Sequence, residues 1–150
     1  MQGLLDLTAP ASAARQQIGP DAWLLKGFAL NDADALLAAI EQIAAQAPFR
    51  HQVTPGGYQM SAAMSNCGAY GWVTDRQGYR YSPQDPQTNQ PWPAMPALFA
   101  ELAERAAQNT GFAHFAPEAC LINRYETGAR MGLHQDKDEQ DFTAPIVSVS

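Results

Sequence analysis

Two stretches of this chain carry apolar residues at the three-to-four spacing of an amphipathic helix. The first begins after Asn31, whose side chain suits a helix N-cap, and ends at Pro48. Its apolar positions are Leu36, Leu37, Ile40, Ile43, Ala44 and Ala47. The second spans residues 97–108 and stops before Gly111, a residue typical of helix C-termini. We expect both helices to cover one face of a sheet.

The remaining apolar segments have the length and turn boundaries of strands. We predict strands over residues 22–28, 119–125 and 146–150, and one that follows a turn at Thr127–Gly128 and ends at residue 136. Two helices followed by antiparallel strands predict an α+β fold on a jelly-roll sheet. Residues 1–20 show no sustained period, so we interpret them as an N-terminal extension and residues 21–150 as one domain.

Glycines and aromatic residues dominate residues 49–92, where no helical period fits. Gly56, Gly57, Gly68, Gly71 and Gly78 separate short segments that contain most of the tyrosines and Trp72. This pattern predicts hairpins, and exposed hairpin loops are common places for binding surfaces.

Composition narrows the class of protein. The 150 residues are 46% hydrophobic and 16% charged, which is typical of an ordinary soluble globular domain. The sequence has no secretory signal and no stretch as long as a membrane span, and its two cysteines are far apart. We expect free thiols in a reducing cytoplasm, although a bridge between Cys67 and Cys120 remains open.

The net charge of −6 argues against a general nucleic-acid binder. Charge is distributed unevenly, however. Residues 48–82 contain Arg50, Arg76 and Arg80 against Asp75 alone, a local balance of +2. A local basic rim of this kind is compatible with binding to phosphate.

Residues 123–136 carry the candidate chemistry. On an extended strand, His134 and Asp136 point to the same side and can hold two adjacent positions on a divalent metal. They would supply two of the three ligands of a non-haem Fe(II) facial triad. Asn123 and Tyr125 are also two apart, on the preceding strand. By spacing alone, His134 and Asp136 are more often a solvated polar pair.

The surrounding strings resemble the AlkB family. They are Asn-Arg-Tyr at 123–125, Leu-His-Gln-Asp-Lys-Asp-Glu at 133–139 and Ala-Pro-Ile-Val-Ser-Val-Ser at 144–150, with Val-Thr-Pro-Gly-Gly-Tyr at 53–58, Arg-Gln-Gly-Tyr at 76–79 and Pro-Gln-Thr-Asn-Gln-Pro-Trp-Pro at 86–93. The resemblance runs in family order from residue 23 to residue 150. It implies a double-stranded β-helix with two N-terminal supporting helices.

The resemblance also implies the cofactors. His134 and Asp136 would be the catalytic metal ligands for Fe(II). Asn123 and Tyr125 would bind the cosubstrate 2-oxoglutarate, and O2 would also be consumed. The implied activity is oxidative demethylation of bases such as 1-methyladenine and 3-methylcytosine in DNA or RNA repair, with release of formaldehyde.

Substrate contacts follow from the same resemblance. Trp72 would stack on the damaged base, Tyr79 and Tyr81 would contact the neighbouring backbone, and Asp138 would read the base edge. Residues 49–92 would include the nucleotide-recognition lid. We expect a cytoplasmic monomer that acts on single- or double-stranded DNA, or on RNA, and does not bind membranes.

The family's second metal histidine and its 2-oxoglutarate arginine lie downstream of these motifs. We therefore expect a domain without its C-terminal strands, and a 150-residue chain that itself has little or no activity. Neither His51 nor His114 matches the downstream ligand. Two alternatives remain: a 2-oxoglutarate oxygenase that acts on a protein or small molecule, and an inactive fragment that binds nucleic acid.

Overall fold

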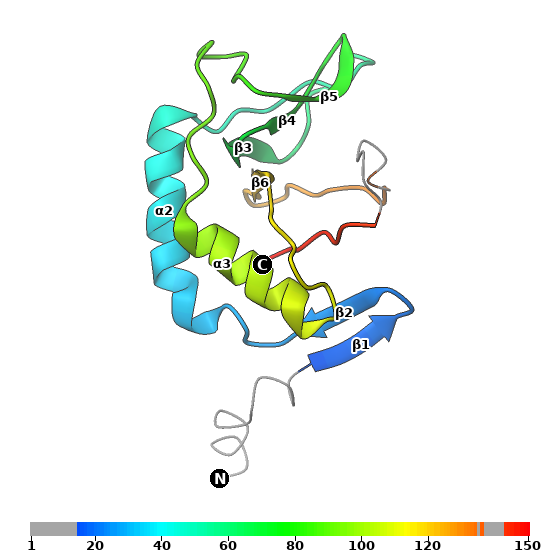
Figure 1. Ribbon diagram of the computed structural model, residues 1–150. Coiled ribbons are helices and arrows are strands. Elements are labelled where there is room, and N and C mark those ends of the chain that lie inside the picture. The colour runs from blue at the N-terminus through cyan, green and yellow to red at the C-terminus, as the bar shows by residue number, and fades with distance from the viewer. Residues whose placement is uncertain (1–14, 135, 137–142) are drawn as a thin grey trace.

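The computed structural model describes residues 15–134, 136 and 143–150. Its elements, in chain order, are β1 (Arg15–Gly19), β2 (Ala22–Leu25), the 3-10 turn η2 (Leu30–Asp32), α2 (Ala33–Gln46), β3 (Ala63–Gly68), β4 (Gly71–Asp75), β5 (Gly78–Ser82), α3 (Ala97–Asn109) and β6 (Ala119–Arg124). In Figure 1, α2 and α3 lie side by side on one side of the molecule, and β3 to β6 gather at one end. This arrangement confirms the expectation of α+β structure with two helices and antiparallel strands.

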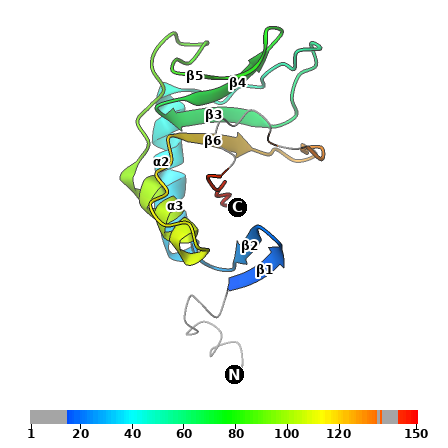
Figure 2. The same cartoon turned by 45° about the vertical axis from the view of Figure 1, so that its right-hand side comes forward.

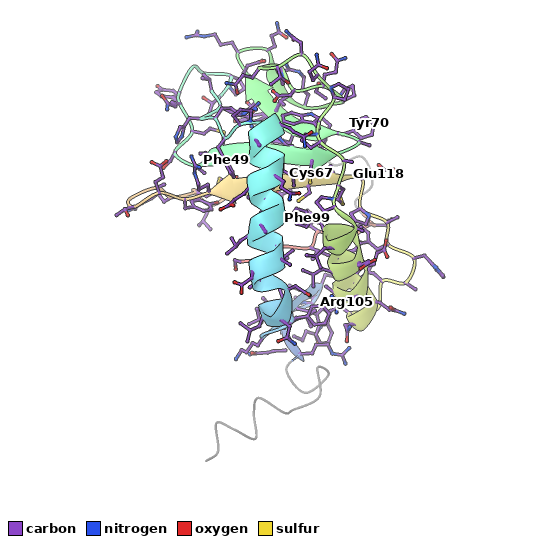
Figure 3. All side chains as sticks on the ribbon, turned by 90° about the vertical axis from the view of Figure 1, so that its left-hand side faces the viewer. Phe49, Cys67, Tyr70, Phe99, Arg105 and Glu118 are labelled. Carbon is purple, nitrogen blue, oxygen red and sulfur yellow. The ribbon has the colours of Figure 1, made fainter. Side chains whose placement is uncertain are left out.

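The sheet formed by β3 and β6 lies against the helices. These strands pair antiparallel, with Ser65 opposite Ile122 and Cys67 opposite Cys120. Ile43 of α2 packs with Cys67 and Ile122 in a core that also includes Phe99 of α3. Figure 2 shows both helices on one side of these strands. Figure 3 views the molecule from that side, with α2 in front of β3 and β6.

The opposite face of the β3–β6 sheet carries a different set of side chains. Because successive residues of a strand point to opposite faces, the neighbours of the core residues point away from the helices. Met64 and Asn66 of β3 and Asn123 of β6 therefore share this second face, and Met64 stands directly opposite Asn123. We call this the site face.

The β4–β5 hairpin lies next to this sheet. Its register places Trp72 opposite Tyr81 and Thr74 opposite Tyr79, and a two-residue turn joins the strands. At the start of β4, Gly71 is required because a Cβ atom there would overlap the indole ring of Trp92. The hairpin predicted from the glycine and aromatic pattern is thus confirmed.

The two helices were predicted closely, with one error at a cap. Helix α3 extends to Asn109, and Gly111 follows with a φ of +94°, as its predicted place at the C-terminal stop requires. The predicted N-cap Asn31 is wrong. It lies inside η2, where the Asp32 amide already donates to the Ala29 carbonyl, so Asp32 takes the cap position without a side-chain bond. Within the described ranges, no helix is both long and apolar enough to cross a membrane.

Two predictions near the N-terminus need correction, one for a strand and one for the extension before it. The strand predicted over residues 22–28 ends at Leu25, because the chain turns at Gly27 with a φ of +69°. Residues 15–19, expected as extension, form β1 and pair with β2 from Arg15–Leu25 to Gly19–Ala22. The boundary expected after residue 20 therefore falls inside a hairpin, whose Arg15 guanidinium donates to the Asn109 carbonyl at 2.5 Å.

The strands predicted after the turn at residues 127–128 are also wrong for the described residues. Residues 126–134 and 143–150 contain no strand. A strand needs a hydrogen-bonded partner. Residues 126–134 contain a turn instead, in which the Ala129 amide donates to the Glu126 carbonyl at 2.9 Å.

Candidate active site

His134 and Asp136 lie side by side although no strand holds them. His134 Nε2 is 3.4 Å from Asp136 Oδ1, and both side chains are about half exposed, at 56% and 52%. His134 Nδ1 is 2.9 Å from the Gly132 carbonyl oxygen. When Nδ1 carries the proton and donates to that carbonyl, Nε2 keeps its lone pair on the side of the carboxylate. A backbone carbonyl orients metal-binding histidines in the same way.

The described residues supply two neighbouring metal donors and no complete cluster. Among them, no group of three histidine, cysteine, aspartate or glutamate side chains is close enough to hold a metal ion. His51 is engaged elsewhere, with Nδ1 3.0 Å from the Met60 carbonyl oxygen. An imidazole nitrogen and a carboxylate oxygen match the ligand preference of Fe(II), so His134 and Asp136 fit two positions of its coordination sphere.

Asn123 presents an unsatisfied polar atom on the site face. Its Oδ1 is buried and has no hydrogen-bond partner in the described part of the chain. Leaving a buried acceptor unpaired costs roughly 1–3 kcal/mol. Bound 2-oxoglutarate has only acceptor oxygens, so it would remove this cost after a half-turn of the amide, by accepting from its N–H groups. The side chain therefore fits the place predicted for it beside 2-oxoglutarate.

The residues after Asn123 divide between the two faces. Arg124 turns toward the helix side, where its guanidinium lies 4.4 Å from the Phe49 ring centre, so it points away from Asn123 as alternation predicts. Tyr125 comes just after β6 ends and is 51% exposed. Its phenol is therefore not held on the strand face that the sequence suggested, and its role in cosubstrate binding stays a prediction.

The hairpin brings the predicted base-binding aromatic residues together. Trp72 and Tyr79 stack with ring centres 5.6 Å apart and planes inclined by 23°. They share one face of the hairpin with Tyr81, since opposed residues in the register point to the same side. Tyr79 remains 49% exposed and Tyr81 36% exposed. An exposed aromatic face of this kind is suited to stack on a nucleobase. The fourth residue of the predicted set, Asp138, lies outside the described residues.

The local basic charge is mostly neutralised. Arg50 holds Asp85 with two bonds of 2.6 and 2.7 Å. Burial works to raise the pKa of the Asp85 carboxyl, but the Arg50 bonds and charge, with backbone N–H donors, lower it below its ordinary value. Arg80 makes two 2.9 Å bonds to Asp75, and these bonds are the main cause of the lowered pKa of Asp75.

Arg76 is the remaining arginine of this segment. It is exposed in the β4–β5 turn, and its Nη2 lies 3.0 Å from where a Cβ of Gly57 would stand. No described acidic side chain forms an ion pair with it. Of the basic rim predicted from composition, Arg76 is therefore the arginine without an ion pair among the described residues.

Sequence reasoning missed the residues that hold Trp72. Asn66 and Gln52 are buried amides, and both bond to the backbone of Trp72. The one signal for Asn66 in the sequence was a polar side chain within a strand. Because a single side chain in a strand says nothing about a partner on another hairpin, the pattern did not identify its role.

Comparison with known proteins gives the family. A family model of the 2OG-Fe(II) oxygenase superfamily matches residues 21–150. The "Alpha-ketoglutarate-dependent dioxygenase AlkB" of Escherichia coli (strain K12) is 57% identical over 147 residues, which cover 98% of this chain and 68% of that protein. An AlkB homolog of Caulobacter vibrioides (strain NA1000 / CB15N) is 40% identical over 149 residues, covering 95% and 66%.

A more distant relative is the "tRNA demethylase abh1" of Schizosaccharomyces pombe (strain 972 / ATCC 24843), 29% identical over 80 residues, 53% of this chain and 26% of that protein. The superfamily implies the jelly-roll fold expected from the sequence, and the bacterial matches confirm the resemblance seen in its motifs. The chain belongs to the AlkB family of iron(II)- and 2-oxoglutarate-dependent dioxygenases.

Proposed function

We propose that this protein removes alkyl groups oxidatively from nucleic-acid bases, of the type of 1-methyladenine and 3-methylcytosine, in the repair of DNA or RNA. The observation that carries the proposal is the open Trp72–Tyr79 pair, on a hairpin next to the sheet that carries Asn123. Methylation at these positions makes the bases cationic, and a cation is attracted to an aromatic face. Family membership supports the same activity.

Each site residue then has a defined task. His134 Nε2 and an Asp136 carboxylate oxygen would hold iron(II), while Asn123 and Tyr125 would bind 2-oxoglutarate. When bound, iron(II), 2-oxoglutarate and O2 would supply oxidation of the N-methyl carbon. The hydroxylated carbon would then leave as formaldehyde, and the cationic base would lose a proton so that its ring nitrogen recovers its lone pair. The carbonyl of Gly132 keeps the imidazole of His134 in its ligand orientation.

The aromatic residues of the hairpin would bind the target base once it is flipped out of its strand. The target base must leave the stack of its own strand before its methyl group can reach the iron-binding residues. Trp72 would receive the flipped base, and the hydroxyls of Tyr79 and Tyr81 would contact the neighbouring backbone. Asp138 is proposed to read the base edge. Free cysteines at 67 and 120 support a reducing cytoplasm as the compartment, and we propose a monomer.

Binding by this chain tests the substrate class first. A labelled single strand with one 1-methyladenine is titrated with the protein, and the same strand without the methyl group is the comparison. We expect tighter binding of the methylated strand, and Trp72→Ala should abolish the difference. Equal binding of the two strands by the unchanged protein would contradict the proposed substrate.

Turnover separates the remaining alternatives. With iron(II) and 2-oxoglutarate added, we expect slow formaldehyde release, because the described residues offer two neighbouring ligands to the metal. Succinate release that the methylated strand does not stimulate would favour an oxygenase with another substrate. Methyl-dependent binding without any formaldehyde would favour the nucleic-acid-binding alternative.

A further inference from the structure

The outer edge of β4 is held by side chains instead of a strand. In the β4–β5 ladder, Asp75 and Gly78 close the two-residue turn as a hydrogen-bonded pair. Since bonding alternates along the ladder, the backbone groups of Trp72 and Thr74 point away from β5. Among the described strands none pairs with that edge, because β4 and β5 form a two-stranded sheet of their own.

Asn66 occupies part of this edge. Its Nδ2 donates to the Trp72 carbonyl at 3.1 Å, and its Oδ1 accepts from the Trp72 N–H at 3.0 Å. The amide therefore pairs with both backbone groups of one residue, as an adjacent strand would. Asn66 is 1% exposed, so water has little access to replace either bond.

Gln52 extends the same pairing by one position. Its Oε1 accepts from the Thr74 N–H at 2.9 Å, and its Nε2 donates to the Trp72 carbonyl at 3.3 Å. It also lies 3.3 Å from the sulfur of Met64 and is 9% exposed. Two buried amides thus satisfy three backbone groups of β4.

The site face connects this edge to the rest of the active site. Asn66 and Asn123 share that face, and Asn123 is the side chain placed for the cosubstrate. We propose that Asn66 and Gln52 are positioning residues, which fix the Trp72 ring at a set distance from the cosubstrate side of the site. This inference rests on the proposed function, in which Trp72 stacks on the target base. Neither amide touches the base; each acts through the Trp72 backbone.

The first test removes the Asn66 amide in Asn66→Ala. A base stack on an aromatic residue is worth about 5- to 150-fold in affinity, so Trp72→Ala sets the full effect on binding of the 1-methyladenine strand. We expect Asn66→Ala to weaken that binding by about fivefold or more, and Gln52→Ala to weaken it less. In the Trp72→Ala background, Asn66→Ala should have no further effect on binding. A further loss in that background, or unchanged binding in the single variant, would overturn the inference.

Ser65→Ala is the matched control. Ser65 is the neighbour of Asn66 on β3 and equally buried, but its hydroxyl donates to the Ala47 carbonyl at 2.5 Å on the helix side. Ser65→Ala therefore loses a buried hydrogen bond on the helix side and keeps the Asn66 and Gln52 bonds to the Trp72 backbone. We expect Ser65→Ala to lower the stability of the protein and to leave its binding of the methylated strand unchanged. Weakening equal to that of Asn66→Ala would show a general effect of destabilisation and overturn the positioning role.

A spectroscopic measurement tests the positioning without any substrate. Stacked Trp72 and Tyr79 should produce a near-UV circular dichroism signal that Trp72→Ala identifies. We expect Asn66→Ala, but not Ser65→Ala, to change that signal in folded protein. If the signal is unchanged in Asn66→Ala, the amides do not position Trp72. If the signal changes while the unchanged protein shows no preference for the methylated strand, positioning stands and the proposed function fails.

Discussion

Replacing Asp85 by asparagine tests the buried ion pair that ties the loop before α3 to the sheet. Asp85 is 1% exposed and Arg50 17% exposed at their side chains. The Asp85 carboxylate accepts two Arg50 bonds and the Gln87 N–H at 2.8 Å. Arg50 in turn exchanges two backbone bonds with Met64 of β3. The pair therefore connects residues 85–90 directly to the strand that carries Asn66.

The expected loss follows from these contacts. Breaking a buried pair by removing one charge typically costs 3–5 kcal/mol. Arg50 reaches some solvent and an asparagine oxygen still accepts one bond, so we expect a lower cost, about 2–4 kcal/mol, for Asp85→Asn at pH 7. Urea unfolding followed by circular dichroism measures it. A loss below about 0.5 kcal/mol would refute the reasoning, since that is the range of ordinary surface changes.

The pH dependence gives an independent check on the same residue. The Asp85 pKa is lowered in the folded protein, so its stabilising effect is present above the unfolded value of about 3.9 and is lost as pH falls through the folded pKa. The stability difference between the unchanged protein and Asp85→Asn should therefore be constant near neutral pH and shrink below about pH 4. A stability difference between the two proteins that grows as the pH falls would contradict the lowered pKa of Asp85.

Three further changes probe other parts of the structure. Gly71→Ala should unfold at clearly lower urea concentration, because its methyl group would overlap the Trp92 ring. Arg76→Gln should weaken single-strand binding and lower the salt dependence of log affinity by about one unit, whereas Arg80→Gln, already paired with Asp75, should change that slope less. The hydrogen bond with Cys120, together with burial, raises the pKa of Cys67, so iodoacetamide at pH 8 should label Cys67 only after unfolding, as mass spectrometry would show.

The two helices and the β4–β5 hairpin were predictable because their signals are local. Leu102 and Ala106 follow the spacing that buries one side of α3, and Gly111 adopts the left-handed conformation that ends it. Alternation along β6 also explains why Arg124 and Asn123 point to opposite faces. Each of these features depends on residues within a few positions of one another.

The errors in prediction arose where a distant or competing contact decides the structure. Asn31 has the side chain of a cap, but it lies inside the 3-10 turn η2, and Asp32 takes the cap position. The strand expected at residues 146–150 has apolar residues, yet a strand forms only with a partner along its edge. His134 and Asp136 were expected together on a strand, and they lie 3.4 Å apart without one.

By itself, the sequence determined the helices, the hairpin of aromatic residues and the motifs of the family, because local spacing and residue type suffice for each. Only the tertiary structure decided which polar groups serve the site. It placed Asn66 and Gln52 on the backbone of Trp72, paired Arg50 and Arg80 with carboxylates, and left Asn123 Oδ1 unpaired. The physical reason is that a hydrogen bond or ion pair needs atoms within about 3 Å, and folding alone brings together groups this far apart in the chain.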